Sequence, residues 1–231
     1  MRLQKFLSAA GVCSRRQGEV YITEGLVKVN GVAVTQLGTQ IDSIQDRVEF
    51  QGKPVTISAP QVYIALNKPK EYVTSCKQDR QKIVLDLISL PQRIYPIGRL
   101  DKDSTGLILL TNDGELHHRL SHPSFNHERE YDVMTLAPIP NGALRKMEKG
   151  LRLQGAKTRP AKVRKTSPRR FRIVLQEGRN RQIRRMVQKV GSEVEELRRI
   201  RVANVKLGRL KQGAWRHLTE KEIRALQALT Q

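Results

Sequence analysis

The stretch GRLDKDSTGLILL, residues 98–110, combines a charged loop with the beginning of a buried strand. Its first half contains glycine and aspartate, whereas its second half is an apolar run of the kind that predicts a strand in a core. Asp101 stands between Arg99 and Lys102, and nearby positive charge favours the ionised form of a carboxyl group. An ionised Asp can act as a nucleophile or as a base, although a salt-bridged or turn-capping Asp has the same local pattern.

From residue 62 onward, apolar runs of strand length alternate with segments of helical periodicity. We expect strands at 62–67, 107–111, 131–137, 171–176 and 194–206, and helices near 82–88, 114–120, 141–149, 179–190 and 220–229. Thr219 and Glu222 have the spacing of a capping box at the start of the last helix. The basic segment 165–172 contains a proline and is expected to be a turn between strands.

The first 58 residues have the pattern of a small separate module. Leu3, Phe6, Leu7 and Ala10 recur at helical spacing, and Ser14 can cap a second helix that runs to about residue 23. An Asn-Gly pair at 30–31 lies between alternating residues and predicts a hairpin, and Val48–Phe50 adds a last strand. Lys53-Pro54 and the segment 58–60 predict the end of the module. We therefore expect domains at 1–58 and 62–231, joined by a linker at 59–61.

The charge balance indicates a polyanionic partner. The chain has 231 residues with 43 Lys and Arg against 22 Asp and Glu, a formal net charge of +21. Basic residues are spread through folded segments, which favours nucleic acid over an anionic membrane surface. The two cysteines are far apart and suggest no disulfide framework or zinc site. With no signal peptide and no membrane span expected, we predict a cytoplasmic protein.

The densest cationic segment runs from Arg164 to Arg185, with nine Lys or Arg residues and one acid. Such a surface is either a solvated face or a phosphate-binding face. In the helix near its end, the periodicity places Arg181 and Arg185 opposite the apolar face and Arg184 at its edge. An Arg at an edge can reach into a cleft and pair with a carboxylate, or it can extend to solvent.

An aromatic residue and a group of histidines are further candidates. Arg129 and Tyr131 share a strand face, and the Tyr is either a base-stacking platform or an ordinary core residue. The four histidines between 117 and 127 lack a convincing acidic third ligand, so we expect no metal site. The sequence contains no phosphate-binding loop and no dinucleotide fingerprint, and we expect no nucleotide or redox cofactor.

Five motifs in order resemble the bacterial ribosomal RNA pseudouridine synthases of the RsuA/RluB/RluE/RluF group. The first 31 residues resemble an S4 RNA-binding domain in RLQKFL at 2–7, SRR at 14–16, GLV at 25–27 and VNG at 29–31. The catalytic-domain motifs of the group are similar to NKP at 67–69, GRLD at 98–101 followed by TGL at 105–107, REY at 129–131 and EGRNRQIRRM at 177–186. The resemblance covers almost the whole chain.

This resemblance implies an α+β fold, in which a small S4-like module with two helices and a sheet precedes a mixed, largely antiparallel sheet with flanking helices. It implies that uridine in RNA is isomerised to pseudouridine without a cofactor. Asp101 would be the nucleophile or base, Arg184 would orient it, Tyr131 would stack on the uracil, and Arg99 would fill the space of a flipped nucleotide. The implied RNA contacts are Arg99, Asn67, Lys68, Arg129, Arg179, Arg181, Arg185, Lys5, Ser14, Arg15 and Arg16.

The partner expected from this resemblance is ribosomal RNA or a ribosome-assembly intermediate, bound by a monomer. The last motif is more similar to the large-subunit branch, and the alternative is a small-subunit target. A catalytically silent S4-type assembly factor is a further alternative, but it would not need the set of Asp101, Tyr131 and Arg184. A metal-dependent nuclease would need clustered acids, which the sequence does not show.

Overall fold

The computed structural model describes residues 1–57, 60–76, 80–122 and 126–229. The chain divides into two compact units. The first consists of Met1–Val62 with the short segments Leu90–Arg93 and Asn112–Gly114, and the second comprises the remaining residues. The linker expected at 59–61 includes residue 59, which lies outside the described residues. The domain boundaries stay a prediction.

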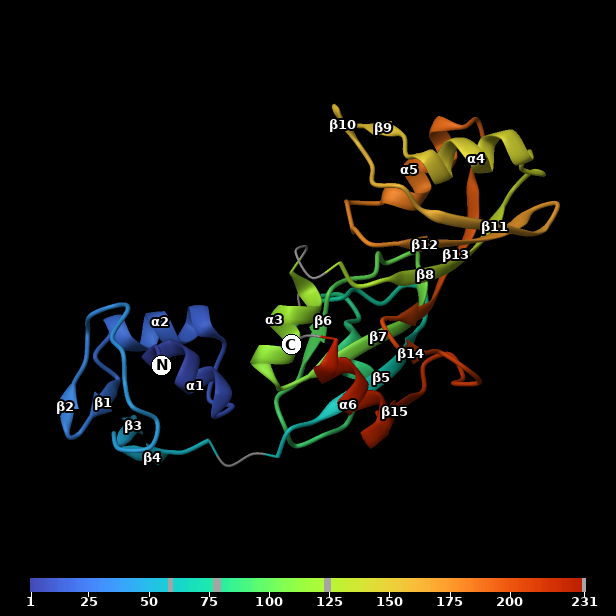
Figure 1. Ribbon diagram of the computed structural model, residues 1–231. Helices are drawn as coiled ribbons and strands as arrows, with labels where there is room; N and C mark the ends of the chain where they lie inside the picture. Colours follow the sequence, from blue (N-terminus) through green and yellow to red (C-terminus); the bar gives the residue numbers. More distant parts are fainter. Residues whose placement is uncertain (58–59, 77–79, 123–125, 230–231) are drawn as a thin grey trace. The chain divides into compact units, whose positions relative to one another are not determined.

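The N-terminal unit contains two helices and a small antiparallel sheet (Figure 1). Its elements are α1 (Leu3–Ala9), α2 (Arg15–Thr23), β1 (Val27–Val29), β2 (Val32–Ala33), β3 (Val48–Phe50) and β4 (Lys53–Val55), and the strand order is β2-β1-β3-β4. Asn30 and Gly31 have φ angles of 51° and 82°, as the tight turn of the predicted hairpin requires. The backbone N–H of Gln17 donates to Ser14 Oγ at 3.1 Å, which confirms the predicted helix cap.

Apolar side chains from both helices and the sheet form the core of this unit. Leu3, Leu7, Ile22 and Val27 are completely buried there. Lys53 and Pro54 were expected to lie in the turn-forming segment that ends the module before a linker, but they form part of strand β4. Gln51 and Gly52, both with positive φ, turn the chain back after β3, and this second hairpin extends the sheet by one strand.

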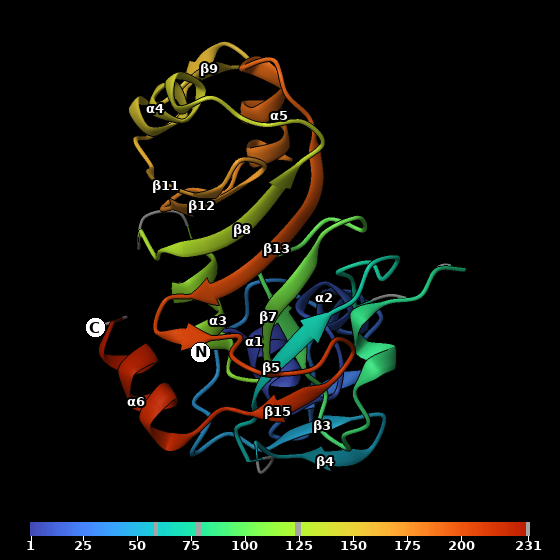
Figure 2. The same ribbon diagram turned by 90° about the vertical axis from the view of Figure 1, so that its right-hand side faces the viewer.

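The C-terminal unit is built on a nine-stranded sheet whose main path has the order β11-β12-β8-β13-β7-β5-β15 (Figure 2). These strands are β5 (Tyr63–Lys68), β7 (Thr105–Thr111), β8 (Arg129–Thr135), β11 (Lys162–Ser167), β12 (Arg170–Leu175), β13 (Val194–Val202) and β15 (Trp215–His217). Two short strands, β6 (Tyr95–Ile97) and β14 (Val205–Lys206), pair with β7 and β13. The pairing of β13 with β7 is parallel, and every other pairing between these strands is antiparallel. The largely antiparallel α+β fold is thus confirmed.

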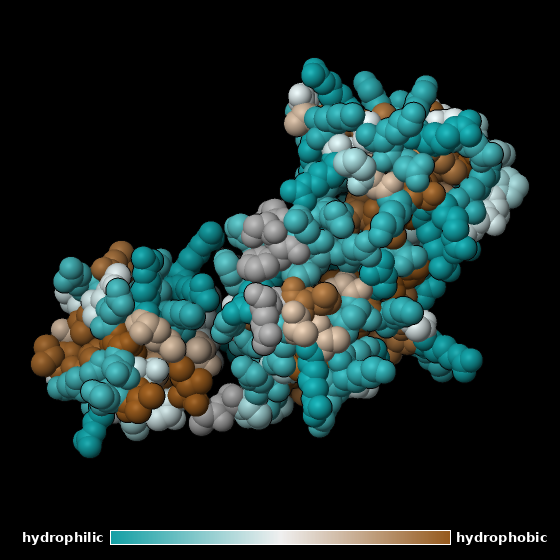
Figure 3. Space-filling view, in the orientation of Figure 1, coloured by the Kyte–Doolittle hydropathy of each residue, from teal (hydrophilic) through white to brown (hydrophobic). Residues whose placement is uncertain are grey.

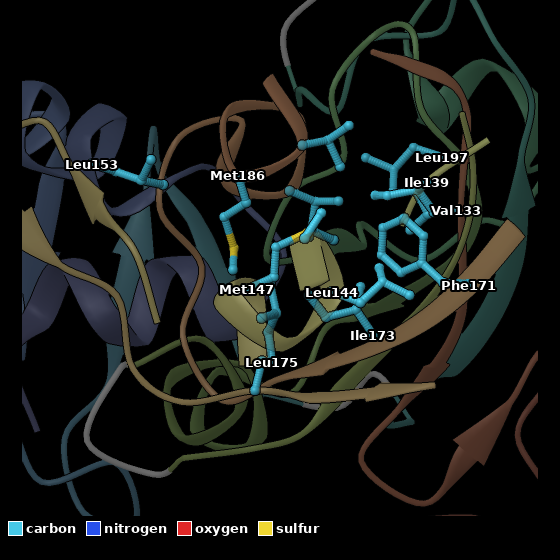
Figure 4. Close-up of a cluster of buried hydrophobic side chains, with 14 residues drawn as sticks. Val133, Ile139, Leu144, Met147, Leu153, Phe171, Ile173, Leu175, Met186 and Leu197 are labelled. Carbon is cyan, nitrogen blue, oxygen red and sulfur yellow. The ribbon is translucent and has the colours of Figure 1, made fainter. Parts of the chain in front are cut away.

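Helices and smaller elements surround this sheet. They are the 3-10 turn η1 (Val84–Leu87), α3 (Gly114–Ser121), α4 (Asn141–Lys149), the hairpin of β9 (Arg152–Leu153) and β10 (Ala156–Lys157), α5 (Gln182–Lys189) and α6 (Glu220–Ala228). Figure 4 shows the apolar core that joins α4 and α5 to β8, β12 and β13, in which Phe171, Met147 and Met186 are completely buried. A second core packs α3 and α6 against β5 and β7.

The distribution of exposed side chains differs between the two units. In Figure 3, hydrophilic side chains cover most of the visible face of the C-terminal unit. Most of the large apolar side chains that are exposed in the described chain belong to the N-terminal unit, among them Val32, Leu37 and Ile44. The visible face of the C-terminal unit therefore has the polar character that contact with a polyanion requires.

Four predicted elements differ in the structure. The helix expected at 82–88 is only the 3-10 turn η1, because Ile83 is extended and forms a bridge with Val73. The segment 165–172 was expected to be a turn between strands, and the turn is present but confined to Pro168 and Arg169, because β11 extends to Ser167 and β12 begins at Arg170. The strand expected at 194–206 ends at Val202, where a turn leads into β14. The helix expected at 179–190 begins only at Gln182, because Arg181 has a φ of 49°.

Candidate active site

A cavity of about 430 Å³ lies within the C-terminal unit, beside the loop that carries Asp101. Its walls come from the loop before β7, the start of β8, the turn before α5 and the middle of β13. Asp101, Tyr131, Arg129 and Arg181 all line it, although they are widely separated in the sequence. The side chain of Asp101 is 35% exposed. The cavity therefore presents a carboxylate that a bound molecule can reach.

Two side chains from other elements hold the loop at Arg99 and Leu100. Thr74 Oγ1 donates to the Leu100 carbonyl at 2.8 Å and accepts from the Leu100 N–H at 3.2 Å. Arg199 on β13 donates from Nη1 to the Arg99 carbonyl at 3.3 Å. Because these bonds fix the backbone on the N-terminal side of Asp101, its carboxylate is carried by a constrained loop.

Lys68, at the end of β5, holds the loop on the other side of Asp101. Its Nζ donates to the carbonyls of Pro69 at 2.8 Å, Lys102 at 3.3 Å and Ser104 at 2.9 Å. The side chain is completely buried, and this burial lowers the pKa of Lys68 to about 8, against the opposing effect of nearby carboxylates such as Asp103. Lys68 was expected to contact RNA, but a buried amine with three protein acceptors positions the loop instead.

Asn67 was also expected to contact RNA, but in the structure it is buried and forms hydrogen bonds within the protein. The residue is only 2% exposed. Its Nδ2 donates to the Leu210 carbonyl at 2.8 Å, and its backbone bonds with Ala214 and Gly213. Asn67 therefore ties β5 to the segment that leads into β15.

The carboxylate of Asp103 binds two arginines from the start of α5. Arg181 donates from Nη1 and Nη2 to its two carboxylate oxygens at 3.3 and 3.0 Å. Arg184 Nε lies 3.3 Å from Asp103 Oδ2, and Arg184 Nη2 donates to the Asp103 carbonyl at 3.2 Å. Burial raises the pKa of the Asp103 carboxyl, but the Arg181 hydrogen bond and the charges of both arginines outweigh this effect and hold it below its ordinary value.

The arginines are therefore arranged differently from the expectation. Arg184 does lie at the edge of the apolar face of α5, with a side chain that is 15% exposed, but it pairs with Asp103 and not with Asp101. The helical periodicity of the sequence had placed Arg181 on the side of the helix opposite its apolar face. Because its backbone is left-handed and stands before the helix, its side chain turns toward the loop, and its Nη1 lies 4.0 Å from Asp101 Oδ2.

Tyr131 and Arg129 share one face of β8, as predicted, and both line the cavity. Arg129 Nη2 donates to the Leu120 carbonyl at 3.2 Å. Burial lowers the pKa of the Arg129 guanidinium, and Tyr131 opposes this shift. Tyr131 is half-buried, so its ring is part of the cavity wall and not part of the core interior. An aromatic ring on a cavity wall beside cations suits a stacked base.

Comparisons with known proteins decide the family. The family described as RNA pseudouridylate synthase matches residues 62–189, and the S4 domain matches residues 1–48. The chain belongs to the RNA pseudouridylate synthase family. The ribosomal large subunit pseudouridine synthase B of Bacillus subtilis is 43% identical, over 99% of this chain and 96% of that protein. The dual-specificity RNA pseudouridine synthase RluF of Escherichia coli K12 is 40% identical, over 96% of this chain and 77% of that protein.

A solved structure has the same fold along almost the whole length. The crystal structure of a pseudouridylate synthase superimposes with a TM-score of 0.73 and 32% identity, and the match covers 98% of this chain and 99% of that one. The resemblance to the RsuA/RluB group with an N-terminal S4 domain is thus confirmed, and this pseudouridine synthase is an isomerase of RNA.

The remaining candidate RNA contacts of the synthase have different surroundings. Arg99 is exposed at the rim of the cavity. Arg179 donates to the carbonyls of Ala156 and Lys157 at 3.1 and 2.6 Å, so it anchors the β9–β10 hairpin. Arg185 Nη2 donates to Asn180 Oδ1 at 2.7 Å. Lys5, Ser14, Arg15 and Arg16 are exposed on the N-terminal unit.

Sequence reasoning missed Arg199, Thr74 and Ser104. Arg199 is 2% exposed, and Ser104 is 1% exposed, and both line the cavity. Arg199 follows the buried Leu197 by two residues, so strand periodicity already places this cation on a buried face. Thr74 has no comparable signal, because its role depends on a contact 26 residues away.

The described residues contain neither a candidate metal centre nor a candidate membrane-spanning helix. None of their His, Cys, Asp and Glu side chains form a group of three or more that could hold a metal ion. Among the same residues, no helix combines the length and the apolar character that crossing a membrane requires. The cofactor-independent reaction and the cytoplasmic location stay predictions.

Proposed function

We propose that this synthase isomerises uridine in ribosomal RNA, and specifically in large-subunit RNA. The named activities of the relatives support this: one is a large-subunit enzyme and the other has dual specificity. The net charge of +21 supports binding to a large RNA, because the phosphate backbone supplies most of the affinity. The S4 domain, with exposed Lys5, Arg15 and Arg16, would add phosphate contacts outside the cavity. We also propose that the protein acts as a monomer.

The reaction centre that we propose is Asp101. The observation that carries this assignment is its carboxylate, held by a tethered loop on the wall of the cavity that Tyr131 also lines. In the reaction, the C1'–N1 bond of uridine breaks, the uracil turns, C5 bonds to C1', and the hydrogen on C5 leaves as a proton. Asp101 either attacks the nucleotide or removes a proton from the sugar. Both routes need an ionised carboxylate.

The surrounding residues have distinct proposed roles. Tyr131 stacks on the uracil, and Arg99 at the rim fills the space that the flipped nucleotide leaves in the RNA. Arg181 and Arg184, joined by Asp103, keep positive charge next to Asp101. Arg181, whose Nη1 lies 4.0 Å from Asp101 Oδ2, can thereby orient the Asp101 carboxylate.

Pseudouridine mapping in ribosomal RNA tests the proposal. RNA from cells that carry the gene is compared with RNA from cells that lack it, and with RNA from cells that express only the Asp101→Asn variant. We expect one or more pseudouridines of the large-subunit RNA to be absent in both deficient strains. Loss of a small-subunit pseudouridine would overturn the subunit assignment, and an unchanged map of both RNAs would overturn the ribosomal target.

A further inference from the structure

Arg199 is a buried cation whose hydrogen-bonding capacity is only partly used. It lies in the middle of β13 and is 2% exposed. Its Nε donates to the Leu107 carbonyl at 2.7 Å and its Nη1 to the Arg99 carbonyl at 3.3 Å. Its Nη2 is buried and has no partner among the described residues. A buried charged donor without an acceptor costs free energy unless a ligand supplies one.

The part of the chain that the structure describes offers no carboxylate within 4.0 Å of Arg199. Buried arginines are normally paired with acids, so its full positive charge remains available to the cavity that it lines. A second buried atom, Ser104 Oγ, also lacks a hydrogen-bond partner among the described residues and lines the same cavity. Two unsatisfied polar groups that line one cavity indicate a polar ligand there.

Arg199 lies opposite Tyr131 in the sheet, the residue on which we propose that the uracil stacks. Arg199 is the cross-strand partner of Tyr131 in the antiparallel pair of β13 and β8. Directly opposite residues in such a pair place their side chains on the same face, about 5 Å apart. A base that stacks on Tyr131 therefore lies next to the guanidinium of Arg199.

We propose that Arg199 Nη2 donates a hydrogen bond to a carbonyl oxygen of the target uracil and stabilises the negative charge that this base gains during the reaction. When the C1'–N1 bond breaks, its electron pair stays on the uracil and is shared between N1 and the two carbonyl oxygens. The same pair later forms the C5–C1' bond, and the C5 hydrogen leaves as a proton. A preorganised cation acts at the step where charge develops. This inference rests on the proposed function, because it needs a uridine in the cavity.

The test combines an arginine variant with an atomic change in the RNA. Wild type and Arg199→Gln are assayed on RNA oligonucleotides that contain the mapped site, with uridine, 2-thiouridine or 4-thiouridine at the target, because sulfur accepts hydrogen bonds weakly. We expect Arg199→Gln to lower kcat on uridine by about 10²-fold with a smaller change in KM. The sulfur substitution that slows wild type should have no further effect on the variant. Arg198→Gln, next to it on β13 but exposed, is the matched control and should behave as wild type.

The outcomes separate this inference from the proposed function. If wild type is active and the sulfur substitutions slow wild type and Arg199→Gln by the same factor, the proposed role of Arg199 is overturned. The proposed function is then unaffected. Inactive wild type on every oligonucleotide would overturn the proposed function. If thermal denaturation shows that Arg199→Gln does not fold, Arg199→Lys replaces it in the same comparison, because it keeps the charge and loses the planar fork. Wild type that is insensitive to both sulfur substitutions would refute the hydrogen bond without any variant.

Discussion

Arg184 Nε lies 3.3 Å from Asp103 Oδ2, so the arginine at the edge of the apolar face of α5 is paired with the second aspartate of the loop and not with Asp101. The same carboxylate receives two hydrogen bonds from Arg181. Asp103 thus joins both arginines into one cluster beside Asp101. Asp103 therefore helps to hold the site together, and a substitution there would disturb it.

The first prediction compares these two arginines. Arg184→Ala and Arg181→Ala should each lower turnover by roughly tenfold, which corresponds to about 1.4 kcal/mol in the activation barrier. Arg181→Ala should in addition weaken RNA binding, because its side chain is more exposed than that of Arg184, at 44% against 15%. Single-turnover rates and RNA affinities measure the two effects separately. A normal single-turnover rate for Arg181→Ala would show that its proximity to Asp101 has no consequence for the reaction.

The second prediction concerns pH and Lys68. The pKa of Lys68 is about 8 in the folded protein, against an ordinary value of 10.5. Below pH 8 both the folded and the unfolded states carry the proton, and the full cost of burying the charge is present. Between pH 8 and 10.5 the folded state loses the proton first, so the contribution of Lys68 to stability rises with pH.

Urea denaturation of wild type and Lys68→Met at several pH values between 7 and 10 measures this contribution. The stability of wild type relative to the variant should increase with pH, by at most about 3 kcal/mol. Titration of other groups cancels in the comparison. A constant difference across this range would mean that the buried amine keeps its ordinary pKa.

The third prediction concerns Gly106 on β7. Its φ is 103°, and an added Cβ would lie 2.2 Å from the carbonyl oxygen of Arg199. Because that neighbour is backbone, the two strands cannot separate without breaking their pairing. Gly106→Ala should destabilise the fold by roughly 3 kcal/mol. Gly142→Ala in the first turn of α4 is the control, since open space surrounds that position, and it should be neutral or slightly stabilising. Chemical denaturation of both variants provides the comparison, and equal stabilities would be inconsistent with close backbone packing at Gly106.

Local sequence signals predicted most elements of the fold. Helix α4 has the predicted bounds, and α6 begins with the expected capping box between Thr219 and Glu222. Those signals are contained in a few neighbouring residues. Strands β6 and β15 were missed because each has only three residues, and their pairing depends on partners outside the local sequence.

The site was predictable where residue type and motif order carried the information, as for Asp101 and Tyr131. The partners of the arginines were not. A single left-handed residue, Arg181, makes the helix begin three residues later than its periodicity suggests and redirects its own side chain toward the loop. The burial of Lys68 was also hidden, because NKP is a loop-like sequence and only the complete sheet shows that β5 is buried along its whole length.

The last prediction concerns the proposed reaction centre itself. Asp101→Asn keeps the size of the side chain but removes the negative charge that a nucleophile or base requires, so the fold and the RNA affinity should remain. Release of tritium from RNA labelled at uracil C5 measures the reaction, because C5 must lose that hydrogen before the product pseudouridine is complete. We expect a loss on the order of 10⁴-fold. The matched control is Asp132→Asn on β8, whose carboxylate lies 3.7 Å from Arg170 and does not line the cavity. Its tritium release should equal that of wild type. Near-normal release by Asp101→Asn would refute the assignment, whereas equal losses in both variants would indicate damage to the sheet and not to the chemistry.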